Sequence, residues 1–373
     1  MSDLPRALYI HVPWCIKKCP YCDFNSHEQA SPDFADYGRA LVNDLNADLE
    51  RYGSTPFVSL FFGGGTPSLF PPKHLEPLFQ RLRDLSLISS ETEISLEANP
   101  GTLDLGHLNG YHDLGINRLS IGVQSFNRNV LRALGRIHDR NQAVAMIEQA
   151  KTIGFKRVNV DLMHGTPAQT PAIALEDLNI VKNLEVSHLS WYQLTIEPNT
   201  GFYSKPPKLP NENTLDATEK SGLDFITSMG LQQYEVSAFT RPGEEAKHNI
   251  NYWEFGDYFG IGAGAHGKIT TGRGVVRTQR TRQPVNYLAR TDIHATQYPL
   301  SDSHLGAECL MNGLRLKSGI SYARFRERTG MEPVKFRKAY LMEADRLNML
   351  KPDRFQTSEI GWRHLNHILE MLI

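Results

Sequence analysis

Cysteine is scarce in this sequence, with four residues in a chain of 373. A domain held together by disulfides would carry many more, so the composition excludes a disulfide framework. Three of the four nevertheless lie within eight residues, as Cys15, Cys19 and Cys22. Thiols gathered so closely in a cysteine-poor chain indicate metal or redox chemistry.

An excess of charge of one sign is also absent, because 40 basic and 41 acidic residues leave a formal net charge of -1. No overall field therefore attracts nucleic acid or an anionic membrane. No apolar run approaches the ~20 residues of a membrane span, and the first 15 residues lack the regions of a signal peptide. We expect a cytoplasmic protein with no integral membrane segment and no nucleic-acid partner.

Short apolar and β-branched runs, each bounded by Gly, Pro or Asn, predict buried strands. They lie at residues 7–13, 57–65, 93–100, 118–126, 157–165 and 188–196. Apolar residues at three- and four-residue spacing predict helices between them, at 37–52, 74–85, 141–154 and 174–184. This alternation implies parallel strands with right-handed crossovers, in an α/β barrel or a doubly wound sheet. Six such units favour an α/β fold with a partial (β/α)6-type barrel.

The remaining pattern divides the chain into three parts. Residues 1–240 form the predicted barrel core, with a further strand at 234–239 and a long loop at 201–213. Residues 241–303 form an extension rich in glycine and aromatic residues that becomes a weakly patterned connecting segment. Residues 304–373 have helical periodicity and predict a small, mainly helical C-terminal domain.

The cysteines have the spacing CxxxCxxC. Three thiolates can bind three corners of a cubane [4Fe-4S] cluster, which leaves the fourth iron open to a substrate or cofactor. The alternatives are a zinc site completed by His11 or His27 and a structural cluster completed by Cys309. Zinc is the weaker interpretation, because such sites usually use paired CxxC units and the sequence contains one.

CxxxCxxC at the end of the first predicted strand, with Tyr21 before its last cysteine, resembles the radical S-adenosylmethionine (radical SAM) superfamily. The resemblance implies that the open iron chelates the amino and carboxylate groups of SAM, whose sulfonium the cluster cleaves to a 5'-deoxyadenosyl radical. FFGGGTPSL supplies Gly64, Gly65 and Thr66, where glycines let the backbone approach a ligand and offer N–H groups. This segment resembles the one that holds the amino group of SAM.

Polar residues at later strand ends extend the resemblance to the coproporphyrinogen dehydrogenase branch. The positions that resemble its SAM contacts are Tyr9, Glu97, Gln124, Arg136 and Asp161. Each residue has a structural alternative when taken singly, such as capping a turn or pairing locally. Taken together and in order, they indicate a SAM site.

One position separates two functions within that branch. The dehydrogenase carries a further cysteine two residues after the cluster motif, where this chain has Phe24. CPYCDFNSH is instead similar to the HemW family of heme chaperones, which implies a chain that binds heme as cargo and delivers it to haemoproteins such as respiratory enzymes. The enzyme alternative is oxygen-independent oxidation of coproporphyrinogen III to protoporphyrinogen IX, which Phe24 argues against. A nucleic-acid-modifying radical enzyme fits poorly with the balanced charge.

The heme itself needs an axial ligand. HNINYW, which begins at His248, matches the HNxxYW pattern of the HemW family, and imidazole is a standard axial ligand. His248 is the first choice and His266, in GAGAHG, is the rival; a structural role for His248 with Tyr252 and Trp253 packing around it is the alternative. The resemblance is also compatible with peripheral contact with membrane respiratory complexes, and the sequence leaves open whether the chain forms a homodimer.

Overall fold

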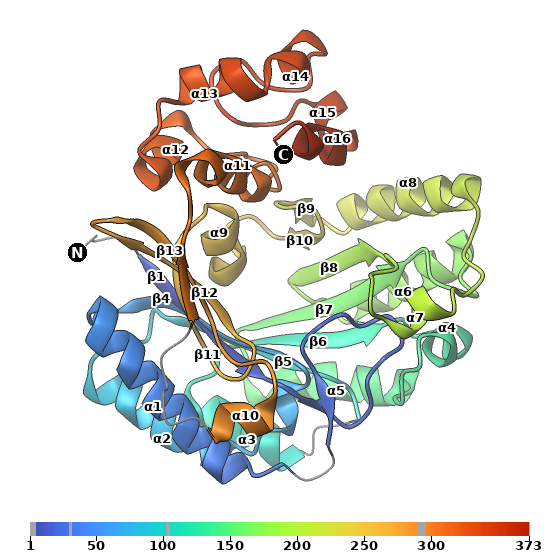
Figure 1. Ribbon diagram of the computed structural model, residues 1–373. Coiled ribbons are helices and arrows are strands. Elements are labelled where there is room, and N and C mark those ends of the chain that lie inside the picture. The colour runs from blue at the N-terminus through green and yellow to red at the C-terminus, as the bar shows by residue number, and fades with distance from the viewer. Residues whose placement is uncertain (1–4, 30–31, 102–104, 290–295, 373) are drawn as a thin grey trace.

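The computed structural model describes residues 5–29, 32–101, 105–289 and 296–372. Six parallel strands follow one another around a curved sheet, in chain order and in space (Figure 1). They are β1 (Arg6–Val12), β4 (Phe57–Gly64), β5 (Glu93–Ala98), β6 (Arg118–Gln124), β7 (Arg157–His164) and β8 (His188–Gln193). The predicted partial barrel of an α/β fold is confirmed, because each expected run forms one of these strands.

Helices cover the outer face of this sheet (Figure 1). They are α1 (Phe34–Tyr52), α2 (Pro72–Asp84), α3 (Leu105–Leu114), α5 (Arg140–Ile153), α6 (Pro171–Asn183) and α8 (Glu212–Ser228). The side chain of Asp139 accepts from Gln142 N in a capping box at the start of α5, and Gly154 ends the helix with a φ of 103°. The apolar sides of helices and strands share one large core, which fixes the strand ends relative to one another.

The sheet continues beyond β1 through the extension. β11 (Asp257–Ile261) runs parallel to β1, with Tyr9 paired to Gly260, and β12 (His266–Thr271), β13 (Gly274–Gln279) and β14 (Thr296–Pro299) follow antiparallel. The extension is also fastened to α1. Arg280, which is fully buried, makes ion pairs with Asp44 at 2.5 Å and Asp48 at 2.9 Å.

The other edge of the sheet differs from the sequence prediction. Instead of one strand at 234–239, the chain forms β9 (Gln232–Gln233) and β10 (Ala238–Thr240), both antiparallel. The residues between them turn back, because Tyr234 N donates to Ala238 O. The expected loop at 201–213 contains the short helix α7 (Gly201–Ser204), and α8 begins at Glu212.

The C-terminal region is helical, as predicted, and lies at one end of the sheet (Figure 1). Its helices are α11 (Asp302–Gly313), α12 (Tyr322–Thr329), α13 (Pro333–Tyr340), α14 (Met342–Arg346), α15 (Glu359–Arg363) and α16 (Leu365–Glu370). They enclose a second core around Phe325 and Phe355, which Phe255 and Val275 from the extension also join. The boundaries near 240 and 303 stay predictions. None of the helices in the described ranges has the length and apolar character needed to cross a bilayer.

Candidate functional site

The inner face of the partial barrel is polar at alternate positions of its strands. Because side chains alternate across a strand, every second residue of β5 to β8 faces the interior while those between pack outward. The inward residues that line one cavity of about 440 Å³ include Ser95, Glu97, Arg118, Ser120, Gln124, Asn159, Asp161, His188, Ser190 and Tyr192. We refer to this space as the first cavity.

The cysteine loop forms one wall of the first cavity. Cys15 ends the short strand β2 (Trp14–Cys15), which pairs with β3 (His27–Glu28). In the loop that joins these two strands, Cys22 N donates to Cys19 O and closes a turn. All three thiols line the cavity. Two polar side chains from other segments reach their sulfurs: Thr66 Oγ1 lies 3.4 Å from Cys15 Sγ and Arg136 Nη1 lies 3.6 Å from Cys19 Sγ.

These contacts fit an iron-sulfur cluster. A hydroxyl and a guanidinium beside the sulfurs stabilise negative charge on thiolates and on a cluster that they hold. No set of three or more His, Cys, Asp or Glu in the described ranges converges on a single metal ion. A cubane does not require that convergence, since each cysteine of such a cluster binds a different iron.

The glycine segment lies against the cysteine loop. A Cβ on Gly65 would come within 2.5 Å of the Trp14 backbone, and Gly64 has a φ of +114° that disfavours side chains. The N–H groups of Gly64, Gly65 and Thr66 donate to Glu97 Oε2, Val12 O and Trp14 O. Contrary to the expectation from the sequence, these amides are used within the protein. All three residues still line the cavity.

Two carboxylates face the cavity from β5 and β7, the strands on either side of β6. Burial and the nearby charge of Asp161 raise the pKa of Glu97 to about 8, although the bond from Gly64 N lowers it. Burial likewise raises the pKa of Asp161, whose oxygens accept from Ser120 at 3.0 Å and Asn159 at 2.7 Å. A cation in the cavity would stabilise both carboxylates in their charged form. The sulfonium group of SAM is such a cation, so this part of the site fits SAM.

Arg136 and Gln124 also line the first cavity. Arg136 Nη2 donates to Gly122 O at 2.6 Å and also to the Asn99 side chain, which holds the guanidinium near Cys19. Gln124 accepts from Tyr192 Oη at 2.8 Å and has a φ of 68°. Strained backbone of this kind persists where surrounding structure demands it, as at ligand sites.

The sequence also proposed two tyrosines. Tyr21 lines the first cavity and packs on Phe202, with ring centroids 6.3 Å apart. Tyr9 instead lines a second cavity of about 480 Å³, which shares Phe24, Gly64 and Glu97 with the first. Tyr9 Oη is hydrogen-bonded to His11 Nδ1 at 2.8 Å. The structure therefore places Tyr9 beside the predicted SAM site, on the other side of Glu97.

His248 is packed against side chains of β1 and β4 and does not line either cavity. It belongs to α9 (Lys247–Trp253), is 4% exposed, and stacks on Phe61 with ring centroids 4.3 Å apart. Burial lowers its pKa to about 3. The residues that line the two cavities do not include it. Heme ligation by His248 stays a prediction, and it would require the ring to leave this stack.

The alternatives for the cysteine cluster are not supported. Cys309 is fully buried in the second core among C-terminal helices, away from the cavity that the other cysteines line. Both ring nitrogens of His11 are engaged, with Tyr9 Oη and with Asn25 O at 2.8 Å. Neither His11 nor His27 forms a zinc site with the cysteines, since no such group exists in the part of the chain that is described.

Sequence reasoning missed a polar network deeper in the first cavity. Asn159 Nδ2 donates to Ser120 at 2.8 Å and Ser190 at 2.9 Å, and its oxygen contacts His188 Nδ1 at 2.6 Å. These residues are in register on adjacent strands, where Ser120 pairs with Asn159 and Asn159 with His188. The sequence did contain a pattern that could have predicted this network, because polar residues occupy every second position of strands whose other residues are apolar.

Comparison with known proteins agrees with this site. Residues 9–179 match the Radical SAM superfamily. The chain is 42% identical to the heme chaperone HemW of Haemophilus influenzae and 41% identical to that of Escherichia coli, in each case over 99% of this chain and 98% of the relative. The chain belongs to the HemW family. Membership implies a [4Fe-4S] cluster and SAM as cofactors, and the residues of the first cavity fit both.

A solved structure supports the fold of this HemW family member. Coproporphyrinogen III oxidase (HemN) from Escherichia coli, described as a radical SAM enzyme, superposes with a TM-score of 0.84. The match covers 99% of this chain and 90% of that chain at 23% sequence identity. At this identity the likeness establishes a shared fold, which here extends through the helical C-terminal region as well as the barrel.

Proposed function

We propose that the chain is a heme chaperone, which binds heme and delivers it to haemoproteins such as respiratory enzymes. The observation that carries the proposal is the extent of the similarity to curated heme chaperones, which spans 99% of this chain and 98% of the relative. The similarity is therefore not confined to the cofactor-binding barrel. It includes the extension and the C-terminal helices, where cargo and recipient would be handled.

In this proposal the first cavity holds the resident cofactors. Cys15, Cys19 and Cys22 bind the [4Fe-4S] cluster, which supplies a reducing electron when it is bound. The side chains proposed to surround SAM are Tyr21, Thr66, Glu97, Gln124, Arg136 and Asp161, with Gly64 and Gly65 bounding it and Tyr9 behind Glu97. Glu97 and Asp161 attract the cationic end of SAM, and the Arg136 guanidinium lies beside Cys19.

A second candidate is oxygen-independent coproporphyrinogen III oxidase. The shared fold with HemN favours it. Phe24 argues against it, because the chain has this phenylalanine where the dehydrogenase pattern has a fourth cysteine. The Phe24 side chain is 55% exposed and lines both cavities, so the position faces ligands.

One assay separates the two candidates. Anaerobically reconstituted protein is incubated with SAM, a low-potential reductant and coproporphyrinogen III, and protoporphyrinogen and 5'-deoxyadenosine are measured together. In parallel, heme-loaded protein is mixed with an apo-haemoprotein and heme transfer is followed by the absorbance spectrum. We expect transfer without protoporphyrinogen. Formation of protoporphyrinogen with no heme transfer would reject the chaperone.

The surroundings of the first cavity suit contact with a recipient. Ile16, Ile137 and Tyr203 are each about half exposed or more, at 49%, 54% and 58%. Ile16 and Ile137 directly adjoin the cavity residues Cys15 and Arg136. We propose that the chain works in the cytoplasm and approaches membrane respiratory complexes peripherally. Sedimentation of the heme-loaded protein tests whether a homodimer takes part.

A further inference from the structure

The second cavity is built by segments distant in sequence. Tyr9 lies on β1, Phe24 and Asn25 follow the cysteine loop, and Tyr252 lies in the last turn of α9. Asn25 Nδ2 donates to Ala263 O at 3.1 Å and to Arg282 O at 2.9 Å, which fastens the cysteine loop to the extension. The cavity is thus a product of the fold.

Two glycines of the extension, Gly262 and Gly264, let its backbone lie close to β1 and to the residues that follow the cysteine loop. A Cβ on Gly264 would lie 2.1 Å from the Asn25 side chain, and one on Gly262 would lie 2.5 Å from His11 O. Both glycines also have positive φ values, of +87° and +98°. These residues do not frame a phosphate. They place His266, the first residue of β12, at the wall of the second cavity.

Besides Glu97, which it shares with the first cavity, the wall of this cavity combines three kinds of group. Its aromatic surface comes from Tyr9, Phe24, Tyr252 and Tyr258, with the last two rings 4.5 Å apart. His266 contributes an exposed imidazole and Arg282 an exposed guanidinium. Within the described ranges, no hydrogen bond occupies the ring nitrogens of His266 and no carboxylate pairs with Arg282. Burial and the charges of Arg277 and Arg282 lower the pKa of His266, which favours the neutral, ligating form.

These groups match the chemistry of an iron porphyrin. A macrocycle packs on aromatic rings, its iron takes an imidazole nitrogen, and its propionates pair with a guanidinium. We propose that heme binds in the second cavity with His266 as an axial ligand and Arg282 as a propionate partner. This inference rests on the proposed function, since it assigns a site to the cargo of the chaperone.

Other histidines near the cavities are less suitable ligands. His11 has both ring nitrogens hydrogen-bonded, and His188 in the first cavity contacts Asn159 and Tyr234 through its two nitrogens. His248 is sealed between aromatic rings, with Phe61 on one side and Tyr252 at 4.6 Å. Asp161 lines the first cavity and not the second, and its carboxylate repels propionates there, whereas Glu97 lines both cavities.

The test measures hemin binding to the anaerobically reconstituted full chain. We expect His266→Ala to weaken hemin binding at least tenfold and to change the Soret band and the electron paramagnetic resonance spectrum. Added imidazole should restore the spectrum, because it can fill the vacated coordination position. His248→Phe replaces the imidazole by a ring that can still stack on Phe61, and so tests the rival ligand. Loss of hemin affinity in His248→Phe with none in His266→Ala would assign the axial position to His248 and overturn the assignment to His266.

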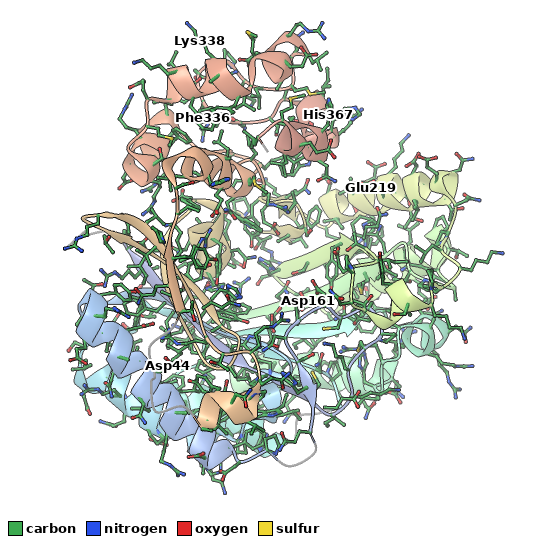
Figure 2. All side chains as sticks on the ribbon, in the orientation of Figure 1. Asp44, Asp161, Glu219, Phe336, Lys338 and His367 are labelled. Atoms are coloured by element: carbon green, nitrogen blue, oxygen red, sulfur yellow. The ribbon has the colours of Figure 1, made fainter. Side chains whose placement is uncertain are left out.

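The matched control is His367→Ala, an exposed histidine on α16 far from the cavities (Figure 2). Its spectrum and affinity should equal those of the unaltered protein. Cluster content and thermal melting verify that each variant is folded. An unchanged hemin spectrum in His266→Ala would overturn the assignment while heme binding itself stands. If the unaltered chain binds no hemin, the chaperone proposal fails instead.

Arg282→Gln provides an independent test. It should weaken hemin several-fold but leave the dimethyl ester of heme unaffected, because the ester has no propionate charge to lose. Equal losses for hemin and its ester would reject Arg282 as the propionate partner. Equal affinities of both variants and the unaltered chain for hemin would reject the whole site.

Discussion

The two cavities that meet at Phe24, Gly64 and Glu97 differ in the charge that they present. The first collects three thiols and two carboxylates. Donors lie beside the sulfurs of Cys15 and Cys19, and burial raises the pKa of both carboxylates. The second collects aromatic rings, the imidazoles of His11 and His266 and the guanidinium of Arg282 beside the shared Glu97. The first is therefore suited to a cationic ligand and a cluster, and the second to a flat ligand with anionic side groups. The comparison teaches that a wall shared by two cavities, which we call the partition and which consists of Phe24, Gly64 and Glu97, can separate binding sites suited to ligands of different charge.

The largest effect is expected from Cys19→Ser. A hydroxyl is a poor ligand for iron, so this variant should lose the [4Fe-4S] cluster, while hemin affinity measured without SAM stays unchanged. Iron and sulfide analysis with hemin titration measures both cavities in one sample. Cys309→Ala, in the second core, is the control and should keep full cluster content. Full iron and sulfide content in Cys19→Ser would falsify the ligand assignment.

A smaller effect is expected from Asp161→Asn. Loss of a charged partner for bound SAM costs about 1.5–3 kcal/mol, which is roughly 10- to 100-fold in affinity. Because Asp161 lines the first cavity only, hemin affinity should not change. Isothermal titration with SAM and hemin checks the split. A comparable loss for both ligands would mean that the cavities are not chemically separate.

The pH dependence of SAM binding sharpens the same comparison. In the ligand-free chain Glu97 has a pKa of about 8, so it is protonated at lower pH. A bound cation lowers that pKa, so SAM binding releases a proton below about pH 8. Affinity should therefore rise from pH 6 to about pH 8 and then level off. Glu97→Gln should flatten this profile; an unaltered slope in that variant would exclude Glu97 as the titrating group.

The smallest effect is expected from Phe24→Ala. The side chain is 55% exposed, so its removal should change the free energy of unfolding by less than about 0.5 kcal/mol. It contributes a wall to each cavity, and loss of an aromatic contact worth about 0.5–1 kcal/mol should weaken both ligands about two- to fivefold. Parallel titrations measure this. A loss confined to one ligand would show that Phe24 serves one cavity.

Sequence patterns predicted most of the barrel because its signals are local. Each of the six strands carries its own apolar run, and each run is bounded by Gly, Pro or Asn, which are residues typical of turns. The partnership of β11 with β1 has no local signal, since it joins Arg6 to Asp257. Helix α8 was also missed, although Asn211 accepts from Thr214 N as its N-cap.

The candidate site divides in the same way. The cysteines and glycines have a fixed spacing, so a motif predicts them, and the structure places them on one cavity with Glu97 and Asp161. The second cavity could not be predicted, because its wall combines residues from β1, the cysteine loop and the extension. His248 illustrates the limit of a motif, since its place in an aromatic stack depends on packing against Phe61.

The shared partition has a thermodynamic consequence. Phe24, Gly64 and Glu97 belong to both cavities, so a ligand that shifts any of them in one cavity changes the free energy of binding in the other. Such coupling is reciprocal: the factor by which bound SAM changes the affinity for heme equals the factor by which heme changes the affinity for SAM. The affinity of such a carrier for heme therefore depends on whether SAM is bound.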